Sequence, residues 1–305
     1  MNLRQLEYFV QVAELGSFSR AARLLGLAQP ALSRQVRALE TDLRETLLLR
    51  NGRGVELTDA GRRLFDHAVA ILQQIAHARD DMGEHRDEPV GRIVVGLPPS
   101  LGRQLTLPLI DAFRKELPRA RLAIVEGLTA HIAEWIATGR VDLALLHNPE
   151  AAPELEIKPV LEEMLCLVQP APRRARGARP SAAERAPLPL RALARFPLVV
   201  PDRMHALRRL METQAALAGV HLDIAWEVSS VPSIVDLVAA GYGNAVLPRS
   251  AVAASGRAAE LAMRPLGDPP LHSVLCVAAS AHRRATPLAR RVAALLDELA
   301  RTIDA

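Results

Sequence analysis

The chain has 305 residues, half of them hydrophobic, and a formal net charge of +4 at pH 7. A chain of this length is too long to fold around one small hydrophobic core, so we expect two or three domains. No apolar run approaches the ~20 residues of a membrane span, and no apolar segment follows the charged start as in a signal peptide. We therefore expect a cytoplasmic protein with no membrane partner. Cys166 and Cys276 form no C-x-x-C pair, which favours buried thiols over a disulfide, a zinc site or a redox switch.

The positions of the basic residues along the chain are more informative than their total number. Almost all are arginines, so the net charge alone is a weak argument for a nucleic-acid partner. The window from Leu15 to Leu39, however, contains no acidic residue and four arginines: Arg20, Arg23, Arg34 and Arg37. Such a window attracts the phosphates of a nucleic acid.

Residues 1–58 show the spacing of three helices joined by tight turns. The first has an apolar stripe that ends before Gly16: Leu3, Leu6, Phe9, Val10 and Ala13. Ser17 or Ser19 is placed to cap the second helix, and Gly26 to end it. Pro30 stands where the third helix opens, and the buried stripe of that helix follows: Leu32, Val36, Leu39 and Leu43. This spacing predicts a helix-turn-helix.

The opposite face of the third helix carries Gln29, Ser33, Arg34 and Arg37 near its start. Glutamine pairs with adenine, arginine with guanine, and serine with a base edge or a phosphate. A solvated polar face is the alternative interpretation, and the acid-free window argues against it. The turn-prone segment Arg50–Gly54 and the apolar residues that follow it predict a two-stranded wing, with Arg53 at its tip.

Residues 59–88 form the second segment, a long helix after the N-cap Thr58. Its apolar positions alternate steps of three and four: Gly61, Leu64, Ala68, Ile71, Ile75, Ala78 and Met82. This heptad seam predicts pairing with a second copy of the chain. The alternative is that the seam packs on its own domain.

From Pro89 onward, apolar strands alternate with amphipathic helices, which predicts an α/β fold with a mostly parallel sheet and helices on both faces. Ligands of such sheets bind at the carboxyl ends of the strands. Hydroxyls stand at three strand-to-helix turns, at Ser100, Thr129 and Ser229–Ser230, and helix N-termini there suit a small organic anion. His147 and His205 follow two further strands and could line the same cleft, although each hydroxyl or histidine taken alone is more often structural.

Motifs of enzymes are absent from the sequence. Gly96–Gly102 lacks the lysine of a phosphate loop, and Gly241–Gly243 lacks the third glycine of a dinucleotide fingerprint. No nucleophile elbow, zinc-protease motif or paired carboxylates occur. We therefore expect no catalytic residues, metal site or cofactor. A solute-binding protein, a thiol sensor and an α/β enzyme are weaker alternatives to a DNA-binding protein.

Three segments, Leu3–Phe9, Gly16–Ala22 and Ala28–Glu40, closely resemble the LysR-type transcriptional regulators, as does Arg53–Arg62. Further likenesses are Gly96–Ser100, Glu126–Thr129 and Gly241–Pro248, most similar to the nitrogen-assimilation-control and aromatic-catabolism branches. The resemblance implies a winged helix-turn-helix (1–58), a dimerising linker helix (59–88) and an effector-binding domain (90–305) like the type 2 periplasmic binding proteins. Within it, subdomain I takes about 90–163 and 268–305, and subdomain II about 164–267, with crossovers near 162–168 and 265–272.

The resemblance also implies partners and site residues. Partners are double-stranded DNA, a small-molecule effector and further copies of the chain, as dimers assembling into a homotetramer. The residues expected to bind DNA are Ser19, Arg20, Gln29, Pro30, Ser33, Arg34, Arg37 and Arg53. Those expected to bind the effector, where the resemblance adds Pro201 and Val231, are Ser100, Thr129, His147, Pro201, His205, Ser230 and Val231.

Overall fold

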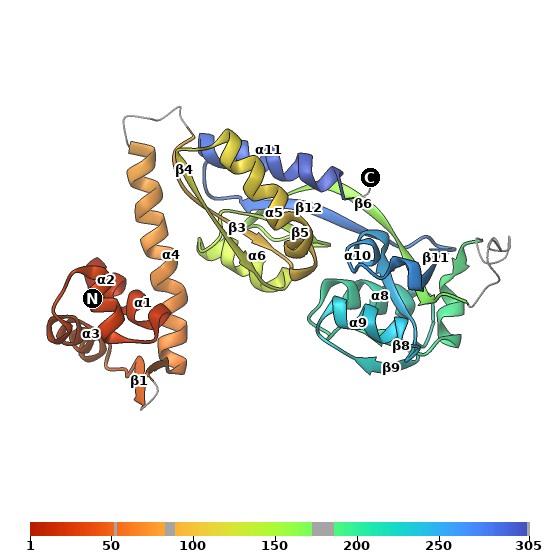
Figure 1. Ribbon diagram of the computed structural model, residues 1–305, viewed down its shortest axis with the longest axis horizontal. Helices are drawn as coiled ribbons and strands as arrows, with labels where there is room; N and C mark the ends of the chain where they lie inside the picture. The colour runs from red at the N-terminus through yellow and green to blue at the C-terminus, as the bar shows by residue number, and fades with distance from the viewer. Residues whose placement is uncertain (52–53, 83–88, 173–185, 304–305) are drawn as a thin grey trace. The chain divides into compact units, whose positions relative to one another are not determined.

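The computed structural model describes residues 1–51, 54–82, 89–172 and 186–303. They form two compact units, one built mainly from residues before 87 and one from residues after it. The elements of the first unit are α1 (Leu3–Leu15), α2 (Phe18–Leu25), α3 (Gln29–Leu43), β1 (Leu48–Asn51), β2 (Gly54–Leu57) and α4 (Asp59–Met82). Figure 1 shows α1, α2 and α3 gathered beside one half of α4.

Helix caps place the turns of the first unit where the sequence predicts them. Ser17, rather than Ser19, caps α2, because its side chain accepts a hydrogen bond from the Arg20 amide. Gly16 and Gly26 end α1 and α2 in the left-handed conformation that glycine adopts without strain. Buried apolar side chains from the three helices, among them Phe9, Leu32 and Val36, share one core. The expected helix-turn-helix is present.

The expected two-stranded wing is present as well, as the antiparallel pair β1 and β2. Its start is held by Glu40 of α3, whose carboxylate accepts hydrogen bonds from the amides of Leu47 and Leu48 at 2.9 and 3.2 Å. The Val55 amide donates to the Gly16 carbonyl at 3.0 Å. These bonds attach the wing to both α3 and the turn between α1 and α2.

Helix α4 packs on its own unit over its first half. Thr58 caps it, since the Gly61 amide donates to the threonine hydroxyl at 2.9 Å. Gly61 itself must lack a side chain, because a Cβ there would lie 2.1 Å from the Leu47 carbonyl oxygen. Ala68 is buried in the core of the first unit, whereas Ile71 is 37% exposed. The start of the predicted heptad seam is therefore covered within one chain, whereas Ile71 and Ala78 further along it are exposed.

The second unit contains an eight-stranded mixed sheet and a separate two-stranded one. Strand order in the large sheet is β4-β3-β5-β12-β6-β11-β7, with β10 also paired to β6. The strands are β3 (Gly91–Leu97), β4 (Ala120–Glu126), β5 (Leu143–His147), β6 (Leu155–Pro170), β7 (Leu188–Pro189), β8 (Leu198–Val200), β9 (Ile224–Glu227), β10 (Ala245–Pro248), β11 (Leu261–Gly267) and β12 (His272–Ser280). The helices are α5 (Pro99–Glu116), α6 (Thr129–Thr138), α8 (Ala206–Leu217), α9 (Val231–Ala239), α10 (Arg249–Ala253) and α11 (Pro287–Arg301), with 3-10 turns η1 (Leu190–Arg195) and η2 (Ala258–Glu260).

The sheet departs from the mostly parallel arrangement that the alternation predicts. β3 runs parallel to β4 and β5, but β12 runs antiparallel to both β5 and β6. The mixed arrangement is built around β6, a single 16-residue strand that pairs antiparallel with β12 up to Met164 and with β10 from Leu165. Its exposed polar side chains interrupt the apolar pattern, so the sequence does not reveal a strand of this length.

Two subdomains lie along β6, and we name them by their elements. Subdomain I comprises β3, β4, β5, β12 and the first part of β6, with α5 and α11 on one face and α6 on the other. Subdomain II comprises β7 to β11 and the rest of β6, with α8, α9 and α10 (Figure 1). Each has its own buried apolar core, and the chain passes from one to the other along β6 and between β11 and β12.

Candidate DNA interface and ligand cleft

The outer face of α3 presents the residues expected to read bases. Gln29, Pro30, Arg34 and Arg37 are exposed, whereas Leu32 and Val36 on the opposite face are buried. Ala28 precedes the helix and supplies no side-chain cap, and the first turn contains no acidic residue. The positive end of the helix dipole therefore stands open to a phosphate.

Ser33 does not project from this face as expected. It is only 9% exposed, and its hydroxyl accepts a hydrogen bond from Arg50 Nη2 at 2.8 Å. The Arg50 guanidinium also lies 4.1 Å above the centre of the Phe18 ring, a cation–π contact. Ser33 was expected to face solvent because helical spacing alone cannot show that a wing residue folds back over it. Arg50 is the residue near the interface that the sequence reasoning missed.

The other residues expected to bind DNA differ in their exposure and in the contacts that they make within the chain. Ser19 is exposed at the start of α2. The Arg20 guanidinium donates to the carbonyl of Leu15, so part of its hydrogen-bonding capacity serves its own turn. Arg53 lies outside the described residues.

A cleft between subdomains I and II holds a cavity of about 30 Å³. By the same measure one water needs about 10–15 Å³, so the cavity in this conformation takes a ligand of few atoms. It brings together four of the seven residues expected there: Ser100, His147, His205 and Val231. The remaining residues of the lining were not expected from the sequence: Leu101, Gln104, Leu207, Leu247, Pro248, Ser250, Ala251 and Ser273. No strand-to-helix hydroxyl pattern marks most of these positions.

The three other expected residues lie elsewhere. Thr129 is buried behind the cleft, where its hydroxyl donates to the His147 carbonyl at 3.4 Å. The Pro201 carbonyl accepts from Arg208 Nη1 at 3.2 Å. Ser230 is exposed at the start of α9 and its side chain makes no cap hydrogen bond. Val231, one position further, takes the place in the lining that the serine was expected to share.

His147 ends β5 and belongs to a connected set of polar groups. Its Nδ1 lies 3.3 Å from Ser273 Oγ, and Asn148 Nδ2 donates to that same oxygen at 3.1 Å. The Val274 amide donates to Asn148 Oδ1 at 2.8 Å. Burial, and to a lesser degree the neighbouring His205, lower the pKa of His147 to about 4. The ring is therefore uncharged at neutral pH.

His205 caps α8 with its imidazole, since Nδ1 accepts a hydrogen bond from the Leu207 amide at 3.2 Å. Burial lowers the pKa of His205, Asp202 opposes that shift, and Arg209 adds to it. Three residues further along the chain, the Arg208 side chain is only 1% exposed. Besides donating to the Pro201 carbonyl, its guanidinium forms an ion pair with the Glu212 carboxylate at 2.7 Å and lies 3.8 Å from that of Glu227. Arg208 thus holds the loop from which His205 enters the cleft.

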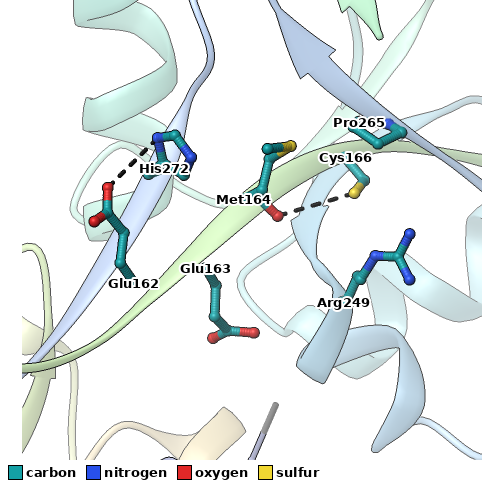
Figure 2. Close-up of a pocket in the computed structure, with 7 residues that line it drawn as sticks. All are labelled: Glu162, Glu163, Met164, Cys166, Arg249, Pro265 and His272. Atoms are coloured by element: carbon teal, nitrogen blue, oxygen red, sulfur yellow. Dashed lines mark hydrogen bonds and ion pairs between the residues drawn. The ribbon is translucent and has the colours of Figure 1, made fainter. Parts of the chain in front are cut away.

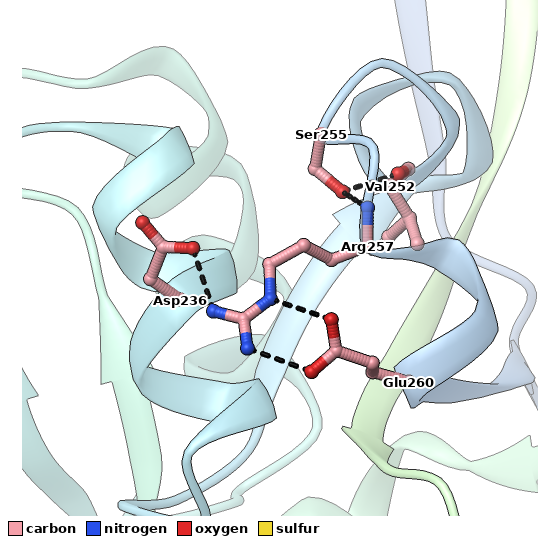
Figure 3. Close-up of polar contacts among 5 residues, drawn as sticks. All are labelled: Asp236, Val252, Ser255, Arg257 and Glu260. Carbon is pink, nitrogen blue, oxygen red and sulfur yellow. Dashed lines mark hydrogen bonds and ion pairs between the residues drawn. The ribbon is translucent and has the colours of Figure 1, made fainter.

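An ion cluster braces α9 from outside, as Figure 3 shows. Arg257 Nη1 binds Asp236 of α9 at 2.9 Å, while Nε and Nη2 bind the two oxygens of Glu260 at 3.0 and 2.7 Å. These contacts raise the pKa of Arg257 and lower that of Glu260. The cluster connects η2 to the helix whose first residue, Val231, lines the cleft.

A second, larger hollow of about 630 Å³ lies where β6 passes between subdomains (Figure 2). It is lined by Glu162, Glu163, Met164, Cys166, Arg249, Pro265 and His272. Burial raises the pKa of the Cys166 thiol, and Arg249 only partly opposes the rise. Burial likewise raises the pKa of Cys276, and both thiols are buried and free, as the sequence predicts. Neither has the exposed, acidic thiol typical of a redox sensor.

Within the described ranges, no three acidic, histidine or cysteine side chains gather in a way that could hold a metal ion. None of the helices described there has the length and apolar character needed to cross a membrane.

Residues 3–62 match the family described as bacterial regulatory helix-turn-helix protein, lysR family, and residues 86–301 match the LysR substrate binding domain. The nitrogen assimilation regulatory protein nac of Klebsiella aerogenes is 31% identical over 297 residues, 97% of this chain and 94% of that protein. A full-length variant of OxyR from Pseudomonas aeruginosa has a TM-score of 0.69 at 25% identity, covering 99% of this chain and 94% of that one. CbnR complexed with its target DNA shares the fold, with a TM-score of 0.66 at 22% identity, covering 99% and 100%. The chain therefore belongs to the LysR family and is a DNA-binding transcriptional regulator with an effector-binding substrate domain.

Proposed function

We propose that a small organic anion bound between subdomains I and II controls how this regulator engages its operator. The observation that carries the proposal is the cavity in the cleft, to which α5 and β5 contribute from one subdomain and α8, α9 and α10 from the other. A ligand there contacts both subdomains at once, so it binds best at one particular closure. Binding then shifts the population toward that closure.

The proposed reading of DNA uses the exposed face of α3. Gln29 and Arg34 contact base edges, Pro30 and Arg37 lie beside them, and Ser19, Arg20 and Arg53 contact the backbone. Ser33 acts through Arg50, which it holds against Phe18. The exposure of Gln29, Arg34 and Arg37, together with the uncapped start of α3, supports this assignment.

Pairing through α4 completes the proposal. Ile71 and Ala78 of the seam are exposed in a single chain, which supports a dimer through the linker helix, and membership of the LysR family favours a homotetramer. A paired reader suits operators with two half-sites. We further propose that the protein acts in the cytoplasm and catalyses no reaction.

The test is binding of the full chain to the DNA upstream of its own gene, measured by fluorescence anisotropy with random DNA of equal length as control. We expect a specific complex whose affinity falls steeply with salt. A panel of small organic acids should then change its affinity or the length of DNA protected from nuclease. Equal affinity for the upstream and random DNA over a range of salt concentrations would contradict the proposed DNA reading.

A further inference from the structure

The cleft is lined by two imidazoles that come from opposite sides of it. His147 ends β5 in subdomain I, and His205 precedes α8 in subdomain II. The two rings are close enough for His205 to lower the pKa of His147. Any role of the pair in ligand binding rests on the proposed function, in which this cleft is the ligand site.

The protonation state of His205 is set by its cap. A backbone amide can only donate, so Nδ1, which accepts from the Leu207 amide, carries no hydrogen. The neutral ring therefore has its hydrogen on Nε2, and Nε2–H remains available to a ligand. A second proton would have to go to Nδ1 and would displace the cap.

The partner of His147 Nδ1 is a hydroxyl, which can either donate or accept. The Val274 amide fixes Asn148 Oδ1 as an acceptor, so Nδ2 is the donor to Ser273 Oγ. When the serine hydroxyl donates to His147 Nδ1, the neutral ring carries its hydrogen on Nε2. When the hydroxyl turns, its oxygen can accept from a protonated Nδ1 instead.

None of the twelve residues that line this cavity is an arginine, lysine, aspartate or glutamate. An anion entering it would lose its hydration and meet no fixed positive charge, which is costly. The charged groups about the pair lie outside the lining and carry both signs. They include Arg249, between the lining residues Pro248 and Ser250, and the buried Arg208 with Glu212 and Glu227. Asp202 and Arg209 shift the pKa of His205 in opposite directions, and Arg209 also pairs with Glu150 at 3.5 Å. In the other elements around the cavity, Glu163 accepts a hydrogen bond from the Ser250 amide, and Glu126 lies against α5 at Gly102.

We propose that the cleft takes up its anionic ligand together with one proton, which His147 accepts at Nδ1 as the Ser273 hydroxyl turns from donor to acceptor, while His205 keeps its cap and stays neutral. One imidazolium supplies the missing positive charge, and the ring that stays neutral donates from Nε2. Two adjacent imidazolium rings would repel each other, so a single proton is the expected stoichiometry. The regulator would then respond to an organic acid more strongly in a more acidic cytoplasm.

The test uses the full chain and propionate as the probe, with propionamide as an uncharged control of the same shape. Calorimetry in two buffers of different ionisation enthalpy measures the protons taken up on binding. We expect an uptake approaching one proton per chain, and an affinity for propionate that rises by up to about tenfold per pH unit as the pH falls from 8 to 6. Propionamide should bind with no such pH dependence.

His147→Gln keeps a donor and removes the titration, so it should flatten the pH dependence. His205→Gln should weaken propionate binding and leave the pH dependence in place. His221→Gln, at an exposed position outside the cleft, is the matched control and should leave it unchanged. Three results would each overturn the proposal. They are propionate binding without proton uptake, a pH dependence shared by propionamide, and no binding of propionate at 50 mM, a concentration on the order of the weakest useful affinity. Specific operator binding that persists in any of these cases would leave the proposed DNA-reading function intact. His147→Asn replaces His147→Gln if that variant does not fold.

Discussion

Arg50 Nη2 donates a hydrogen bond to Ser33 Oγ at 2.8 Å and thereby joins the first strand of the wing to α3, the proposed DNA-reading helix. The same guanidinium covers the ring of Phe18 on α2. One side chain therefore connects three elements of the helix-turn-helix, and the wing cannot turn independently of α3. Its remaining donors stay available to a phosphate, because a guanidinium has five.

Loss of this contact should weaken DNA binding without unfolding the protein. Arg50→Met keeps an apolar stem over Phe18 and removes the hydrogen bond, and Ser33→Ala removes its acceptor. Each should cost about 1 kcal/mol in stability, the usual worth of one hydrogen bond, and should lower operator affinity. In a double-mutant cycle the two losses should not add. Full additivity in thermal melts and anisotropy titrations would show that the two residues act separately.

Arg34→Ala should reduce discrimination between the operator and random DNA by about 1–3 kcal/mol, because a base contact carries sequence information and a phosphate contact does not. Arg4→Ala, which removes an exposed arginine of α1 outside the acid-free window, is the control. Anisotropy titrations on both DNAs measure the ratio. Equal losses on operator and random DNA for Arg34→Ala would assign the residue to the backbone.

Arg208→Met should destabilise the second unit by about 1–3 kcal/mol, since it leaves the Pro201 carbonyl without its buried donor. The neighbouring change Arg209→Met removes only a surface ion pair with Glu150 and should cost close to nothing. Urea unfolding of the two variants separates these outcomes. Indistinguishable stabilities would mean that the Pro201 loop does not depend on Arg208.

His147 should make stability depend on pH. Its pKa is about 4 in the folded protein and 6.5 as the ordinary value, so the unfolded chain binds more protons between these limits. The contribution of His147 to the free energy of unfolding is then fully present above about pH 6.5. It is lost as the pH drops toward 4, at a cost of about 1–3 kcal/mol. Thermal melts from pH 7.5 to 4.5 should show a shallower loss for His147→Gln than for the wild type. A steeper loss in the variant would reverse the sign of the argument.

Local signals in the sequence predict the first unit well. Gly16 and Gly26 mark helix ends through their left-handed backbone, Ser17 through its capping side chain, and Pro30 through its fixed φ and missing N–H. The helices begin and end where these residues indicate. The place of Ser33 could not be predicted in this way. Its neighbour Arg50 lies seventeen positions away and reaches it only after the wing has folded.

Long-range pairing limited the prediction of the second unit in the same manner. Individual strands such as β3 and β10 follow from apolar runs, but the antiparallel placement of β12 between β5 and β6 depends on segments more than a hundred residues apart. Hydroxyls at strand ends indicated Ser100 in the cleft lining, yet Ser250 and Ser273 reach it from α10 and β12. Thr129 shows the converse, a hydroxyl at the expected turn that serves the His147 backbone instead.

The central position of β12 in the sheet has a consequence for how the protein is made. A ribosome delivers β3, β5, β6 and all of subdomain II before residues 272–280 emerge, so β5 and β6 wait with unpaired inner edges. Such edges are templates for pairing between nascent chains. Subdomain I thus completes its fold only after translation has passed β12. A chain interrupted within subdomain II would be a strong client for chaperones, even though its DNA-reading unit is already formed.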